Sequence, residues 1–112
     1  MSSLHEALLE KIMTVAAPAK GGDAAPDVDA ALDALVAEKG IPCEWRISII
    51  DLLHLFDLDR TWETRLKMAK ELGMTKDEID SKGSAEINLW LLRQIFDRIV
   101  ERGGKLEATL PV

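Results

Sequence analysis

The chain has 112 residues, which suits one domain with a single hydrophobic core and is too short for a core plus a separate catalytic domain. Hydrophobic residues make up 47% and charged residues 30%, a balance typical of a globular protein and not of a disordered one. With 20 acidic and 14 basic side chains the formal net charge is −6, so no global cationic field attracts phosphates, and we expect no nucleic-acid partner.

The cysteine count and the hydropathy of the chain exclude further classes of protein. Cys43 is the only cysteine, so neither an intrachain disulfide nor a cysteine-rich zinc site can form, and nothing indicates secretion. The first residues, MSSLHEALLEKIM, contain no basic leader and no cleavage site, and no apolar run reaches the roughly 20 residues that span a bilayer. We therefore expect a cytoplasmic protein without an integral membrane segment, a metal or a cofactor.

Residues 4–16 are predicted to form an amphipathic helix, because their apolar side chains share one half of the helical wheel and Ser2 or Ser3 can cap its start. The segment 17–26 that follows contains two prolines and two glycines, which exclude both helix and strand. It therefore predicts a flexible linker that tethers the first helix to the rest of the domain.

A second helix is predicted between Asp27, a suitable N-cap, and Gly40, which can supply a left-handed stop. From Trp45 to Phe56 the apolar residues cover most of the helical wheel and leave only a narrow polar strip. A helix that is apolar nearly all round is packed on several sides. This stretch is therefore expected to be the central helix, beginning at Trp45.

Three helical segments follow. Thr61 or Asp59 can cap a helix over residues 62–72, which ends at Gly73. Thr75 and Glu78 have the spacing of a capping box and predict a short helical turn. The last helix, residues 84–102, gathers its apolar residues on one face and closes at a Gly-Gly pair, whereas the tail 105–112 carries no clear signal.

Together these elements predict an all-α fold, a small bundle of about four helices over residues 27–104, preceded by the tethered amphipathic helix 1–16. Tryptophans at both ends of the corner near residues 45 and 62, and a buried amide that must be hydrogen-bonded, complete the expected core. The predicted structural core consists of Trp45, Ile49, Leu52, Leu53, Phe56, Trp62, Asn88, Ile95 and Phe96.

A second apolar stripe on the last helix predicts an interaction surface. Trp90 falls on the polar side of that helix, flanked by Ile87 and Leu91, so either the N-terminal helix or a partner protein should cover it. The candidate interaction surface consists of Leu4, Leu8, Ile12, Ile87, Trp90 and Leu91.

Three blocks, EWRISIIDLLHLFDLD, KMAKELGM and DSKGSAEINLWLLRQIF, resemble the bacterial and phage family filed as domain-of-unknown-function family 3597. Its members carry a Trp-Arg-x-Ser-Ile-Val-Asp-Leu-Leu core, a Lys-Glu-Leu-Gly turn and an Asn-x-Trp-Leu element in the same order. The resemblance runs from about residue 28 to residue 104. Met74 replaces the usual aromatic residue, and Leu92 replaces a polar or histidine residue. The resemblance implies a helical domain, often behind a low-complexity N-terminal segment, and implies no activity.

Catalytic chemistry has weak support in the sequence. Asp51 and His54, at positions i and i+3, could share a helix face as metal ligands or an acid–base pair, but two ligands are half a site. The other histidine, His5, lies beyond the linker. No nucleophile elbow and no phosphate-binding glycine loop is present. We therefore do not expect an enzyme.

The leading hypothesis is a non-enzymatic protein–protein interaction or scaffold module, in which residues 4–16 bind an unknown partner or self-associate. The alternative is a cell-envelope or glycan-binding accessory domain that uses Trp62 and Trp90 as stacking surfaces. A metal-dependent enzyme built on Asp51 and His54 is the third possibility.

Overall fold

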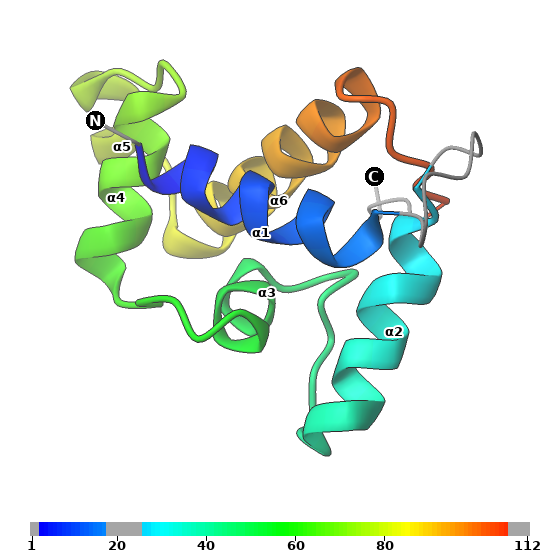
Figure 1. Cartoon of the computed structure of the whole chain (residues 1–112). Helices are drawn as coiled ribbons and strands as arrows, with labels where there is room; N and C mark the ends of the chain where they lie inside the picture. The colour runs from blue at the N-terminus through cyan, green and yellow to red at the C-terminus, as the bar shows by residue number, and fades with distance from the viewer. Residues whose placement is uncertain (1–2, 18–25, 108–112) are drawn as a thin grey trace.

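A computed structural model of the chain describes residues 3–17 and 26–107. Within these ranges the chain forms helices and no β-strand beyond one isolated bridge, so the predicted all-α fold, a small helical bundle, is confirmed (Figure 1). The helices are α1 (Leu4–Ala16), α2 (Val28–Lys39), α3 (Ile49–Leu55), α4 (Trp62–Glu71), α5 (Lys76–Ser81) and α6 (Ser84–Glu101).

Local capping chemistry sets most helix ends where the sequence predicts them. The Asp27 carboxylate accepts from the amide of Ala30 at the start of α2, and Gly40 ends that helix with a φ of 62°. Thr61 caps α4, and the Thr75–Glu78 capping box opens α5. These signals are reliable because they satisfy backbone groups that have no partner inside the helix.

The central helix begins later than predicted. Residues 45–47 form a turn in which the amides of Ile47 and Ser48 both donate to the carbonyl of Glu44, at 3.0 Å. The Ser48 hydroxyl then caps α3 by accepting from the amide of Asp51. The prediction of a helix start at Trp45 is therefore wrong, because the serine cap and the tight turn outweigh the continuous apolar run.

Helix α1 lies inside the bundle and does not stand apart from it. It crosses the molecule against α2, α4 and α6 (Figure 1). Leu8, Leu9 and Ile12 have no exposed surface, and burying each such side chain contributes about 1.5–3 kcal/mol. The expected tethered helix is thus a core element. The predicted linker 17–26 falls mainly on residues 18–25, which lie outside the described residues.

The core joins residues from α1 to α6. Trp45 is 1% exposed and meets Phe96 edge to face, with ring centroids 6.2 Å apart. Seven of the predicted core residues are buried: Trp45, Ile49, Leu52, Leu53, Phe56, Ile95 and Phe96. Trp62, in the first turn of α4, is instead 38% exposed, and Asn88 of α6 is half-buried.

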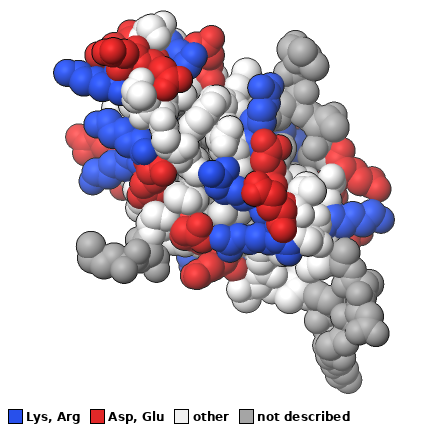
Figure 2. All heavy atoms as spheres, turned by 90° about the horizontal axis from the view of Figure 1, so that it is seen from above, with Lys and Arg blue, Asp and Glu red and all other residues white. Residues whose placement is uncertain are grey.

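The start of the tail is part of the folded body. Lys105 forms an isolated parallel bridge with Asp27, its amide donating to the carbonyl of Pro26 while its carbonyl accepts from Val28. None of the described helices combines the length and apolar character needed to cross a membrane. On the face seen in Figure 2, basic and acidic side chains alternate with uncharged ones.

Candidate functional site

An open groove of about 520 Å³ lies between α1, α2 and the end of α3. Helix α1 lines it with Ala7, Glu10, Lys11, Thr14 and Val15, which the helical repeat places on one face, away from the buried leucines. The opposite wall consists of Leu35, Lys39, Leu55, Phe56 and Asp57. The groove is therefore lined by apolar side chains together with charged ones of both signs.

The end of the groove is fixed by the way α3 terminates. The amide of Leu58 donates to the carbonyl of Leu53, and Asp57 adopts a left-handed conformation with a φ of 57°. Lys39 reaches across from α2 and donates to the carbonyl of Leu55 and, at 3.0 Å, to the Asp57 carboxylate. The hydrogen bond from Lys39 holds the pKa of Asp57 below its usual value. This contact joins α2 to the end of α3 within the wall opposite α1.

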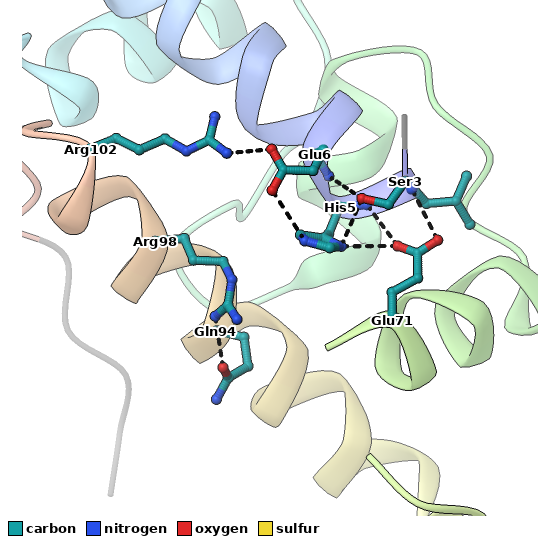
Figure 3. A network of polar contacts seen from close by, with 8 residues as sticks. Ser3, His5, Glu6, Glu71, Gln94, Arg98 and Arg102 are labelled. Atoms are coloured by element: carbon teal, nitrogen blue, oxygen red, sulfur yellow. Dashed lines mark hydrogen bonds and ion pairs between the residues drawn. The ribbon is translucent and has the colours of Figure 1, made fainter. Parts of the chain in front are cut away.

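A polar network secures the first turn of α1 to α4 and α6 (Figure 3). The Glu71 carboxylate of α4 accepts from the amides of Leu4 and His5, at 3.1 and 3.2 Å, and lies 3.0 Å from His5 Nδ1. Glu6 lies 3.4 Å from His5 Nε2 and pairs with Arg102 of α6. First-turn amides have no acceptor within their own helix, and Glu71 supplies one for two amides of α1 from another helix.

This network does not have the geometry of a catalytic triad. Ser3 Oγ and Glu71 Oε1 both lie at Nδ1 of His5, at 3.2 and 3.0 Å, whereas a relay needs the hydroxyl and the carboxylate on opposite ring nitrogens. Asp51 is engaged elsewhere, since its carboxylate accepts from the amide of Glu44 at 2.8 Å. Across residues 3–17 and 26–107, no group of three metal-ligating side chains comes together.

Most of the predicted interaction surface lies inside the bundle. Leu8, Ile12, Ile87 and Leu91 are fully buried, because the apolar stripe of α1 and that of α6 cover each other inside the bundle. Of the remaining two residues, Leu4 is 37% exposed and Trp90 is half-buried against the core. The side of α1 that stays accessible is the one that lines the groove. This side carries both polar and apolar residues, so the sequence did not indicate it as a binding surface.

Two arginines stack on tryptophans at different places in the fold. The Arg46 guanidinium lies 4.2 Å from the ring centroid of Trp45 and donates to both oxygens of Asp33, at 2.7 and 2.8 Å. The Arg65 guanidinium lies 5.1 Å from the Trp62 ring centroid. The i, i+3 spacing of Trp62 and Arg65 can be read from the sequence, but the hydrogen-bond partners of Arg65 cannot.

Arg65 is held by neutral groups. Its Nη1 donates to Asn88 Oδ1 at 2.7 Å, which links α4 to α6, and its Nε donates to the carbonyl of Arg60 at 3.2 Å. Burial lowers the pKa of the Arg65 guanidinium. Asn88 therefore has the hydrogen bond that a partly buried amide requires.

Comparisons with known proteins agree with the expected resemblance. Residues 3–107 match the family described as "Domain of unknown function (DUF3597)". The solution structure of a conserved unknown protein from Rhodopseudomonas palustris is 33% identical, with a TM-score of 0.68 over 98% of this chain and 96% of that one. No curated protein matches the chain. The chain belongs to the DUF3597 family of domains of unknown function.

Proposed function

We infer that this domain is a non-enzymatic protein-interaction module whose groove between α1, α2 and α3 binds an amphipathic helix of a partner protein. The observation that supports this is the groove itself, which combines apolar side chains opposite α1, those of Leu35, Leu55 and Phe56, with charged residues of both signs. Its α1 wall runs from Ala7 to Val15, about 12 Å at 1.5 Å per residue, which matches two turns of a bound helix. Helix-in-groove recognition uses this combination of apolar anchors and a polar edge.

The proposal retains residues 4–16 as the recognition element but moves the contact to another face of the helix. Because Leu8 and Ile12 are buried, only the side of α1 that carries Lys11 and Val15 is available to a partner. The proposal also includes a cytoplasmic location, which agrees with the single, half-buried Cys43 being a free thiol.

A matched pair of valine variants tests the proposal. Val15 is 41% exposed and lines the groove, whereas Val100 is 56% exposed on α6 and does not. Full-length wild type, V15R and V100R are immobilised, and proteins retained from lysate of the native organism are quantified by mass spectrometry. We expect a protein that wild type and V100R retain and V15R loses.

The retained protein is then purified and titrated into the ¹⁵N-labelled domain. The proposal requires amide shifts to concentrate at groove residues such as Leu35 and Phe56, and V15R to weaken binding at least about tenfold, since a buried charge replaces an apolar contact. Shifts confined to another face, or equal retention by V15R and V100R, would contradict it.

A further inference from the structure

The pair formed by Trp62 and Arg65 has an internal counterpart elsewhere in the fold. At the counterpart, Arg46 stacks on Trp45, and Asp33 accepts both guanidinium hydrogen bonds and a third from Trp45 Nε1 at 3.1 Å. This chain therefore contains one complete Trp–Arg–carboxylate unit. Its hydrogen bonds lower the pKa of Asp33, with the largest contribution from Arg46.

The second pair lacks the carboxylate. In the part of the chain that the structure describes, Arg65 forms no ion pair, and the hydrogen bonds of its Nη1 and Nε go to neutral oxygens. A guanidinium has five N–H donors in a fixed plane, so those of Nη2 have no acceptor among the described residues. The indole N–H of Trp62 likewise has no described acceptor, in contrast to that of Trp45.

The surroundings of Arg65 orient it for an external ligand. Asn88 and the Arg60 carbonyl fix the guanidinium from two sides, which reduces the entropy lost on binding. Trp62, on whose ring Arg65 stacks, is 38% exposed, so a ligand bound to Arg65 can reach it. Planar bidentate recognition of carboxylates is the characteristic use of arginine, and tryptophan and arginine are enriched at the energetic centres of interfaces.

We propose that Trp62, Arg65 and Asn88 form a carboxylate-binding site for an acidic residue, flanked by an apolar one, in a partner polypeptide. The partner carboxylate takes the place that Asp33 has beside Arg46, and its apolar neighbour packs on the exposed side chain of Trp62. This site shares no residue with the groove between α1, α2 and α3. The failure of either proposal therefore leaves the other standing.

The test uses two short peptides and the full-length, ¹⁵N-labelled chain. The probes are acetyl-Leu-Glu-Leu-amide and its neutral analogue acetyl-Leu-Gln-Leu-amide. We expect the Glu peptide to shift the Trp62 indole and Arg65 Nε signals saturably, with a Kd on the order of millimolar, since one charge-assisted contact and one aromatic contact carry the binding. The Gln peptide should bind about tenfold more weakly, because a hydrogen bond to a charged group is lost.

Two variants of the site and one control make the test specific. R65K keeps the charge but removes the planar fork, so it should weaken the Glu peptide by a similar factor, whereas R93K, at an exposed position of α6, should not. N88D is nearly isosteric and places a carboxylate beside Arg65, as Asp33 lies beside Arg46. We expect N88D to fold, to raise the Tm and to abolish peptide binding.

Three results would overturn the proposal. One is equal affinity for the Glu and Gln peptides. The second is unchanged Glu-peptide binding by N88D. The third is a saturable shift of Arg65 Nε by inorganic phosphate at concentrations at which the Glu peptide has no effect, which would identify a phosphate site in place of a carboxylate site.

Discussion

Arg46 and Asp33 form a bidentate ion pair, at 2.7 and 2.8 Å, that fixes the turn before α3 to the middle of α2. The same Asp33 carboxylate accepts from Trp45, the largest fully buried side chain of the core. The Asp33 carboxylate therefore pairs with Arg46, which stacks on the Trp45 ring, and also accepts the hydrogen bond of the Trp45 N–H.

Replacing Asp33 by alanine should lower the free energy of unfolding by about 1 kcal/mol. The value is modest because the Arg46 and Asp33 side chains are 43% and 53% exposed, so solvent screens the pair, although the Trp45 N–H also loses its acceptor. Urea unfolding measures the change. D97A, which removes an exposed carboxylate of α6, is the control, and equal midpoints for the two variants would contradict the assigned role.

Replacing Leu9 by alanine should cost about 3 kcal/mol, because the fully buried side chain leaves a cavity between α1 and the bundle. V15A, on the exposed side of the same helix, should change stability by about 0.5 kcal/mol or less. Chemical denaturation compares the two variants. A small effect of L9A would show that α1 is detached from the core in solution.

The stability supplied by Glu71 should depend on pH. Burial raises the pKa of this carboxyl, but hydrogen bonds from the His5 side chain and from the amides of Leu4 and His5 outweigh it, so the pKa lies below its usual value. Glu71 therefore stabilises the fold above the unfolded value of about 4.3, and this contribution disappears as the pH falls through the folded value.

The E71Q variant isolates this contribution. Wild type should exceed E71Q by about 1 kcal/mol at pH 7, and the difference should shrink as the pH is lowered to about 3. Thermal unfolding at a series of pH values measures it, with E63Q, an exposed glutamate of α4, as the control. A difference between wild type and E71Q that does not change with pH would refute this account.

The contact between the end of α6 and the start of α2 should not tolerate a side chain at Gly104. A Cβ there would lie 2.8 Å from Ile99 Cγ2 and 3.1 Å from Val28 Cγ2, so G104A should cost about 1–3 kcal/mol through overpacking. G83A meets open space at a negative φ and should cost less, about 0.5 kcal/mol, because Gly83 is the N-cap of α6 and alanine caps a helix less well than glycine. Calorimetry of both variants tests this, and equal Tm values would show that Ile99 and Val28 move aside without a loss of stability.

Local signals predicted the helices well, and long-range packing accounts for the differences. Asp27, Gly40, Thr61 and the Thr75 capping box act within one helical turn, so they can be read from neighbouring residues. The late start of α3 was missed because the Ser48 cap competes with an apolar run that favours helix on its own. Whether Trp62 lies in the core depends on where the bundle ends, which periodicity does not specify.

The candidate sites were harder to predict than the fold. The groove combines one side of α1 with residues of α2 and α3 that are distant in sequence, and the charged residues that α1 contributes resemble an ordinary solvated face. The difference between the two Trp–Arg pairs is likewise invisible in the sequence, since Asp33 lies in another helix.

The sequence by itself determined the helical class, most helix boundaries and the family of this protein, because these depend on side-chain periodicity, capping and ordered blocks of residues. The tertiary structure alone decided that the apolar face of α1 is buried, which of its faces remains accessible, and which of the two arginines that stack on tryptophan has a carboxylate partner. An amphipathic helix must cover its apolar face, but only the packing of the whole chain determines whether that cover comes from its own bundle or from another protein.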